Sequence, residues 1–323
     1  MANISTCTES TLKDAATSLR SGNLVAFPTE TVYGLGTDAT NEQAVAKLYQ
    51  VKGRPVDHPL IVHISSIENL DRWASEVPEY AIKLARTFWP GSMTLILPRT
   101  NLAKNFITGS QDNVALRVPS HSLALSLLAE FEALGGVGVA APSANRFGKV
   151  SPTTAEAVYE ELSDYLSPED LILDGGPCQV GVESTIINCT KVVPEILRPG
   201  ALTIKLIYDQ TGIEVNHSRN YSNQNKIKVP GLMQSHYAPK AKVFLSAKAR
   251  PGDGFIALSN IETPTGAVRL ANPRTNLEYA RELYQALRLA DNKQLTKVYV
   301  VPPTGNDIAI AIRDRLMRCA SSL

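Results

Sequence analysis

The sequence predicts an α/β protein of two domains, and three observations lead to this expectation. Short apolar runs bounded by Pro or Gly alternate with helical patterns over roughly the first two hundred residues. A polar stretch then interrupts the pattern, and a shorter, simpler alternation follows it. The 323 residues suffice for about two domains, and the 44% hydrophobic content supplies ordinary cores. We expect an N-terminal domain over residues 1–207, a linker over 208–242 and a C-terminal domain over 243–323.

The N-terminal elements follow from apolar spacing and from the residues that end each run. The second expected helix has Thr40 as its N-cap, and Gln43 three residues later completes a capping box. Helices are expected at 9–20, 41–50, 78–88, 121–134 and 153–166. Strands are expected at 24–27, 60–64, 93–97, 114–118, 137–141, 171–173 and 184–187.

The C-terminal pattern predicts a small parallel α/β domain of the Rossmann-like kind. Leu277, Ala280, Tyr284 and Leu287 share one face of its first expected helix. Strands are expected at 242–246, 254–258, 267–270 and 297–301, and helices at 276–290 and 305–319. Before them, the polar residues of 208–242 leave too few large apolar side chains to fold alone.

Charge divides unevenly between the two halves although the formal net charge is only +1. Residues 1–210 contain 16 Lys and Arg against 23 Asp and Glu, whereas residues 211–323 contain 16 against 8. Two solvated surfaces that attract each other account for this split, and a nucleic-acid contact on the basic half is the alternative.

The cysteines and the apolar runs bear on the cellular compartment. Cys7, Cys178, Cys189 and Cys319 form no C-x-x-C pair or metal-type spacing, so reduced thiols are expected. The N-terminus has no signal-peptide pattern, and no apolar run approaches the ~18 residues of a membrane span. We expect a soluble cytoplasmic protein without a membrane partner.

A glycine motif at residues 34–39, GLGTDA, formally matches the dinucleotide fingerprint. That fingerprint needs an acidic residue at the end of the next strand, but Asp57 precedes the strand at 60–64. A dehydrogenase is therefore disfavoured, and no phosphate-binding G-x-x-x-x-G-K-[ST] loop is present.

Several polar residues at the ends of expected strands indicate a binding site for an anionic ligand. Lys52 and Arg54 flank a glycine in a proline-bounded loop, which suits polyphosphate oxygens, and an exposed basic turn is the alternative. Arg117 lies in an apolar strand and needs an acidic partner, a role that a substrate carboxylate would fill. His63, also within a strand, is either a hydrogen-bonded core histidine or a catalyst. Residues 175–185 are expected to form a hairpin that ends in hydroxyl groups.

Taken together, these segments resemble one family, the YrdC-like threonylcarbamoyl-adenylate synthases. The motifs that carry the resemblance are PTETVYGLG (28–36), KGRP (52–55), PLIVHI (59–64), WPGSMT (89–94), ALRVP (115–119), APSAN (141–145) and LRPG (197–200). HYAP at 236–239 resembles the linker signature of the long form, which has two domains. The resemblance implies a twisted mixed N-terminal sheet flanked by helices.

The resemblance also implies an activity and a site. Family members form threonylcarbamoyl-AMP and pyrophosphate from L-threonine, bicarbonate or CO2, and Mg-ATP, and the product feeds the machinery that transfers threonylcarbamoyl to tRNA. The implied threonine site is Thr31, His63, Arg117, Ala141 and Ser184 or Thr185. The implied ATP site is Lys52, Arg54, His58, Asn113, Ser143, Ser151, Arg198 and Tyr237 or His236. Lys52, Arg54 and Arg117 would be the catalytic groups.

Two other functions compete with the synthase. An RNA-binding, translation-regulating protein would bind RNA in a salt-dependent way without ATP turnover. Carbamoyl-adenylate chemistry of the hydrogenase-maturation type would need cysteine-rich zinc modules, and four scattered cysteines argue against it. We further hypothesise that residues 208–242 act as a lid that excludes water from the reactive intermediates.

Overall fold

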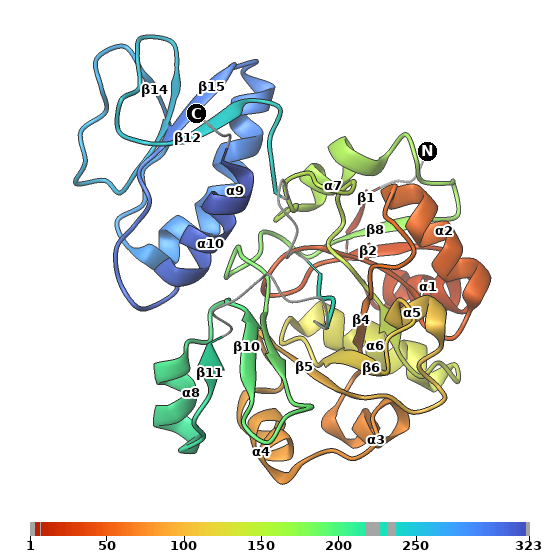
Figure 1. Cartoon of the computed structure of the whole chain (residues 1–323). Coiled ribbons are helices and arrows are strands. Elements are labelled where there is room, and N and C mark those ends of the chain that lie inside the picture. The colour runs from red at the N-terminus through yellow and green to blue at the C-terminus, as the bar shows by residue number, and fades with distance from the viewer. Residues whose placement is uncertain (1–3, 7, 218–226, 231–236, 321–323) are drawn as a thin grey trace.

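The computed structural model describes residues 4–6, 8–217, 227–230 and 237–320. Figure 1 shows a large N-terminal body and a smaller C-terminal domain packed beside it, with α9 (Asn276–Asn292) and α10 (Ala309–Cys319) next to the larger body. Each body has its own sheet, so the predicted α/β class is confirmed for both. The boundaries at residues 207 and 242 stay predictions, and the first of them falls within α8 (Ile204–Thr211).

The large sheet mixes parallel and antiparallel pairs across its strands. Its order within the described residues is β1-β8-β2-β3-β7-β4-β6-β5-β9-β10-β11. The strands are β1 (Ile4–Thr6), β2 (Val25–Phe27), β3 (Gly34–Asp38), β4 (Ile61–His63), β5 (Met93–Pro98), β6 (Asn113–Arg117), β7 (Val139–Ala140), β8 (Leu171–Asp174), β9 (Thr185–Asn188), β10 (Glu195–Arg198) and β11 (Asn216–His217). The mixed sheet implied by the family resemblance is therefore confirmed.

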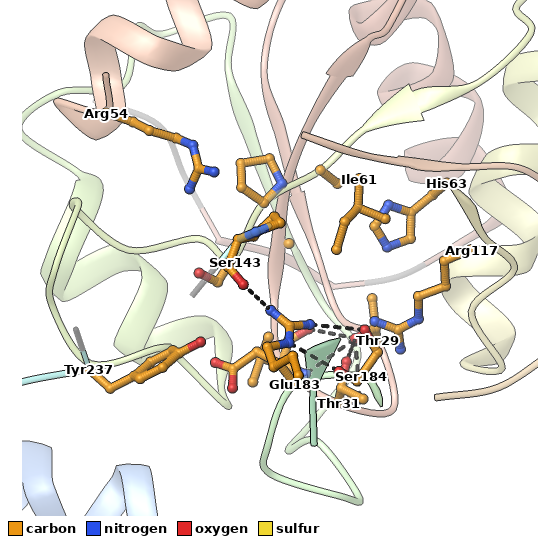
Figure 2. Close-up of a pocket in the computed structure, with 16 residues that line it drawn as sticks. Thr29, Thr31, Arg54, Ile61, His63, Arg117, Ser143, Glu183, Ser184 and Tyr237 are labelled. Carbon is orange, nitrogen blue, oxygen red and sulfur yellow. Dashed lines mark hydrogen bonds between the residues drawn. The ribbon is translucent and has the colours of Figure 1, made fainter. Parts of the chain in front are cut away.

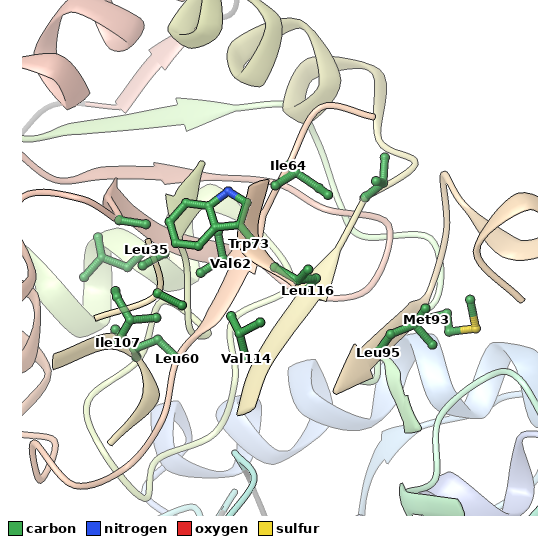
Figure 3. Packing of buried hydrophobic residues seen from close by; sticks show 14 of the residues in the cluster. Leu35, Leu60, Val62, Ile64, Trp73, Met93, Leu95, Ile107, Val114 and Leu116 are labelled. Carbon is green, nitrogen blue, oxygen red and sulfur yellow. The ribbon is translucent and has the colours of Figure 1, made fainter. Parts of the chain in front are cut away.

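Alternation along the strands separates a core face from a face that carries the site. In β4, Ile61 and His63 point toward a cavity (Figure 2). Val62 between them is buried in the main core together with Leu116 and Trp73 (Figure 3). The helices that accompany the large sheet are α1 (Glu9–Arg20), α2 (Glu42–Lys52), α3 (Leu70–Trp73), α4 (Glu79–Phe88), α5 (Asn105–Thr108), α6 (Ser122–Ala133), α7 (Ala155–Leu162) and α8, with a 3-10 turn at Ile67–Asn69.

Helices α1 and α6 cover one part of the face that carries the site, where they pack on Phe27. Over the neighbouring strands, the same face presents Ile61, Ala115 and Ile186, which form a small cluster with Val229. The described linker segment 227–230 is thus docked on the sheet. This packing positions the segment beside the polar cavity described below.

The C-terminal sheet is parallel in every pair, in the order β12-β15-β13-β14. Its strands are β12 (Lys242–Leu245), β13 (Gly254–Ile256), β14 (Val268–Ala271) and β15 (Lys297–Val300). The predicted small parallel domain is confirmed. Its expected helix face is wrong at one residue, because Leu277 is 64% exposed whereas Tyr284 and Leu287 are buried.

Other local expectations also need correction. Helix α2 is capped by Asn41, whose side chain accepts the N–H of Ala44, while the Thr40 hydroxyl donates to Asp38. Strands β1, β3, β10 and β11 are not among the predicted ones: β1 and β11 are mostly polar and partly or fully exposed, β10 contains charged Glu195 and Arg198, and β3 is rich in glycine. Residues 175–185 form no hairpin: β8 pairs with β1 and β2, whereas β9 pairs with β5 and β10.

Two further observations concern membrane spans and cysteines. In the ranges that the structure describes, no helix combines the length and apolarity needed to span a bilayer. Cys178, Cys189 and Cys319 are free and buried, while Cys7 lies outside the described residues.

Candidate active site

A cavity lined by many polar side chains lies against the site face of the large sheet and is partly open to solvent, with about 570 Å³ of empty space when its open mouth is included. Its lining comes from segments far apart in the sequence (Figure 2): Thr29, Thr31, Val32, Gly34, Arg54, Ile61, His63, Arg117, Ala141, Pro142, Ser143, Glu183, Ser184, Arg198, Pro230 and Tyr237. Nine of these residues belong to the predicted site.

One end of the cavity contains a buried ion pair between Arg117 and Glu30. Arg117 donates from Nη2 to Glu30 Oε1 at 2.6 Å and from Nε to the carbonyl of Gly91 at 3.3 Å. The other carboxylate oxygen of Glu30 accepts the N–H of Ser120 at 3.1 Å. Burial would raise the pKa of Glu30, but Arg117 and this hydrogen bond outweigh it and lower the pKa. The acidic partner that Arg117 was expected to need is therefore Glu30 of the protein itself.

His63 lies beside Arg117, since the two residues are register partners in the parallel strands β4 and β6. Its side chain is buried, and its Nδ1 has no hydrogen-bond partner among the described residues. Burial and the neighbouring guanidinium lower the pKa of His63 to about 3, so the imidazole is neutral at ordinary pH. A buried, unpartnered ring nitrogen in a cavity wall favours the ligand-binding interpretation over the satisfied core histidine.

Hydroxyl groups surround this end of the cavity. The hydroxyls of Thr29 and Thr31 are 2.8 Å apart, and Thr29 Oγ1 donates to the carbonyl of Val32 at 2.6 Å. Ser184 Oγ lies 2.7 Å from Thr94 Oγ1 and accepts a hydrogen bond from Arg198 at 3.0 Å. These contacts fix the turn at 29–32 and the start of β9, so both hydroxyl-bearing segments face the cavity in defined positions.

Two arginines supply positive charge near these groups. Arg198 donates to the Ser184 carbonyl at 3.1 Å and to the carbonyl of linker residue Pro230 at 3.1 Å. Arg54 donates to the Pro59 carbonyl at 2.9 Å, and its buried Nε has no partner among the described residues. Burial lowers the pKa of Arg54 to about 10, which still leaves it charged at neutral pH. Both guanidinium groups hold their position through carbonyl and hydroxyl oxygens.

Lys52 does not line this cavity. It lies on the last turn of α2, and its buried ammonium group donates to the carbonyl oxygens of Ser143 and Asn145. Burial and the charge of Arg54 lower the pKa of Lys52 well below its usual value. Lys52 therefore holds the turn that carries Ser143, a residue of the cavity wall. Direct contact between Lys52 and a nucleotide stays a prediction.

The other predicted residues occupy varied positions outside the lining. Ser151 donates to Glu183 at 2.7 Å, and so lies just behind the wall. Thr185 exchanges hydrogen bonds with the backbone of Leu202. His58 packs edge-on against Phe147, Asn113 begins β6, and His236 lies outside the described residues. By contrast, Tyr237 does line the cavity, and Ala141 and Ser143 do so beside it.

Sequence reasoning missed Glu30 and Glu183, although both lie in motifs that were singled out. Glu183 is 5% exposed and accepts hydrogen bonds from Ser151, Tyr284 and Arg315. Burial would raise the pKa of Glu183, but Arg315 and Arg198 outweigh it and lower the pKa to about 2. The available signal was an acidic residue between small and apolar neighbours at an expected strand end, which indicates a buried partner of opposite charge.

No group of three or more His, Cys, Asp or Glu side chains suited to a metal ion occurs within the described part of the chain. Both carboxylates nearest the cavity, Glu30 and Glu183, already accept hydrogen bonds from arginines. The arrangement is therefore suited to binding anions through guanidinium, hydroxyl and imidazole groups.

Comparisons with known proteins agree with this geometry. A family model described as telomere recombination, covering Sua5, YciO and YrdC proteins, matches residues 17–200. A second model, described as the C-terminal domain of threonylcarbamoyl-AMP synthase, matches residues 201–321.

Individual relatives extend the match to nearly the full chain. The threonylcarbamoyl-AMP synthase of Bacillus subtilis is 39% identical over 330 aligned positions, covering 96% of this chain and 92% of that protein. The synthase of Pyrococcus abyssi is 46% identical over 235 residues, or 72% of this chain and 67% of that protein. The crystal structure of P. abyssi Sua5 complexed with L-threonine has a TM-score of 0.88 and 36% identity, covering 99% of this chain and 98% of that one. The resemblance carried by the sequence motifs is confirmed, and the chain belongs to the threonylcarbamoyl-AMP synthase family.

Proposed function

We propose that this protein forms threonylcarbamoyl-AMP and pyrophosphate from L-threonine, bicarbonate or CO2, and ATP. One observation carries the proposal. A single cavity holds Arg117, His63 and several hydroxyl groups together with two further guanidinium groups, those of Arg54 and Arg198. An amino acid and a nucleotide need these two kinds of recognition side by side.

The amino-acid half is assigned to the end that contains Arg117. A guanidinium group binds a carboxylate bidentately, and the Glu30 pair holds Arg117 in place for this. Thr31 and Ser184 would hydrogen-bond the substrate hydroxyl, while neutral His63 accepts or donates one further hydrogen bond. Support also comes from a relative of this chain, P. abyssi Sua5, whose structure contains L-threonine.

The nucleotide half is assigned to Arg54 and Arg198, with Ser143 and Tyr237 beside them. The threonine amine attacks CO2, which enters as such or comes from bicarbonate, and releases a proton to water to give a carbamate. A carbamate oxygen then attacks the α-phosphorus of ATP. The bond from that phosphorus to the bridging oxygen breaks, and pyrophosphate leaves with the electron pair. Such a displacement needs positioning and charge stabilisation more than a protein base, and the two guanidinium groups supply the charge.

Magnesium would enter with the nucleotide. The two carboxylates nearest the cavity are engaged by arginines, so phosphate oxygens and water would provide most of its ligands. When bound, the ion would neutralise phosphate charge, while the protein groups orient the reactants.

The linker contributes to this site in the ranges that the structure describes. Val229 packs on the sheet, Pro230 accepts a hydrogen bond from Arg198, and Tyr237 lines the cavity. These contacts support a lid role for residues 208–242, which would keep water from the carbamate and the adenylate. The product would then pass to the machinery that transfers threonylcarbamoyl to tRNA.

The test is pyrophosphate release from Mg-ATP with L-threonine and bicarbonate omitted in turn. Release that requires both co-substrates is the expected result. Release that ignores both omissions would overturn the assignment. Tight, salt-dependent RNA binding without any ATP turnover would instead favour the RNA-binding function.

A further inference from the structure

A cluster of buried charged and aromatic side chains joins the C-terminal domain to the wall of the cavity. Arg315 of α10 donates from Nε to Glu183 Oε2 at 2.8 Å, and Tyr284 of α9 donates to the same carboxylate at 3.0 Å. Arg315 and Tyr284 belong to the C-terminal domain, whereas Glu183 lies directly before β9 and lines the cavity. The C-terminal domain therefore contacts a carboxylate of the cavity wall directly.

The same two residues also hold Tyr237. The guanidinium carbon of Arg315 lies 5.4 Å from the centroid of the Tyr237 ring, and the rings of Tyr237 and Tyr284 stack with centroids 5.8 Å apart. Tyr237 is 1% exposed and forms part of the cavity lining. Arg315 thus contacts two wall residues at once without lining the cavity itself.

The electrostatic consequence concerns the nucleotide half of the site. An unpaired Glu183 carboxylate in the wall would repel phosphate groups and would attract Arg198, which now donates to Ser184 and Pro230. Arg315 weakens both effects by pairing with Glu183, although it also pairs with Asp314 at 2.6 Å. More of the positive charge of Arg198 and Arg54 is then available to a ligand. Glu183 and Arg315 are nearly inaccessible to water, so solvent screens this interaction little.

We infer that Arg315 is a positioning residue for ATP, which acts through Glu183 and Tyr237 and makes the C-terminal domain part of the nucleotide site. This inference rests on the proposed function, because it concerns the nucleotide of that reaction. It assigns the basic C-terminal half a role inside the enzyme: one of its arginines balances the charge of the catalytic wall. The Arg117–Glu30 pair, which anchors the threonine half, does not include Arg315, and only Ser184 of that half adjoins Glu183 along the chain.

The experiment measures pyrophosphate release and obtains KM separately for Mg-ATP and L-threonine. Arg315→Met should raise KM for Mg-ATP by about tenfold or more, because it leaves a buried carboxylate unpaired in the wall. KM for L-threonine should rise much less, because the Arg117–Glu30 pair that anchors the carboxylate does not include Arg315. Arg315→Lys should restore part of the ATP affinity. Combining Arg315→Met with Glu183→Gln should also recover much of it, because the unpaired charge is then gone.

Arg281→Met is the matched control. Arg281 of α9 also crosses the domain interface, since its Nε donates to the carbonyl of Gln179 at 3.0 Å, but this contact does not involve Glu183. Both KM values should remain those of wild type in this variant. An effect of Arg281→Met equal to that of Arg315→Met would mean that domain docking in general, and not Arg315, sets ATP affinity.

Three results would overturn the inference: an unchanged KM for Mg-ATP in Arg315→Met, a parallel rise in both KM values, or no recovery in the double variant. If Arg315→Met does not fold, Tyr284→Phe provides the test, because it removes only the hydroxyl group that donates to Glu183. A higher KM for Mg-ATP alone supports the inference, and wild-type values contradict it. Failure of the proposed function is distinguishable from failure of this inference, because the wild-type protein would then release no threonine-dependent pyrophosphate.

Discussion

The buried ion pair between Glu30 and Arg117 gives a sharp test of the threonine half of the site. The two side chains are 6% and 5% exposed and their charged atoms are 2.6 Å apart. Glu30→Gln removes the negative charge and leaves the guanidinium group buried without a counter-ion. Breaking a buried pair in this way costs about 3–5 kcal/mol of folding free energy. For a domain of about 200 residues, that loss lowers Tm by roughly 6–20 °C.

L-Threonine should offset part of this loss if its carboxylate binds Arg117. The substrate then returns the counter-charge that Glu30→Gln removed, so added L-threonine should raise Tm more in the variant than in wild type. Differential scanning fluorimetry at several L-threonine concentrations measures both shifts.

Asp170→Asn provides the matched control for this experiment. Asp170 is fully buried and pairs with Lys47 at 2.6 Å, away from the cavity lining. This variant should also lose stability, but its L-threonine shift should equal that of wild type. An equal or smaller shift in Glu30→Gln than in wild type would refute the assignment of Arg117 to the carboxylate.

Three further predictions concern other parts of the site. Burial keeps the pKa of His63 at about 3 in the folded protein, whereas in the unfolded chain it is about 6.5. Below about pH 6.5 the unfolded state therefore binds a proton that the folded state does not. The free energy of unfolding of wild type should fall by about 1.4 kcal/mol per pH unit there, relative to that of His63→Asn. Urea midpoints that run parallel between about pH 7.5 and 5 would contradict this. Gly200→Ala would place a Cβ 2.3 Å from the backbone nitrogen of Thr185, displacing Ser184, and should lower kcat about tenfold in the pyrophosphate assay. Tyr237→Ala opens the cavity wall and should lower turnover at least about tenfold; unchanged turnover would argue against the lid.

Much of the fold followed from the sequence because its signals are local. Apolar runs such as Leu60–Ile64 are long enough to be recognised as buried strands, and the C-terminal domain repeats a simple strand and helix pattern. Predicted site residues at strand ends, such as Arg117 and His63, converge because β4 and β6 are parallel neighbours. The strands that escaped prediction lack an apolar run: β1 and β11 are mostly polar and exposed, β10 begins and ends with charged residues, and β3 contains two glycines.

The direction of a side chain is a different kind of information, and spacing alone did not supply it. Lys52 and Arg54 are two residues apart, yet only Arg54 lines the cavity, because Lys52 still belongs to α2 and points to backbone carbonyls. The sequence also did not show which acidic residue pairs with each buried arginine. Arg117 was recognised as needing an acid, but the acid is 87 residues away in Glu30. Such pairs are defined by the tertiary fold, so a motif shows that a partner is needed without showing which.

Pairing, and not total charge, determines where this protein can bind an anion. Glu30 pairs with Arg117 and Glu183 with Arg315, so the two acids nearest the cavity are neutralised. Arg54 and Arg198 donate only to carbonyl and hydroxyl oxygens within the described residues, and their positive charge therefore remains for a ligand. A formal net charge of +1 conceals this local excess. Because Arg315 comes from α10, we expect the cavity to bind polyphosphate well only when both domains are folded and docked.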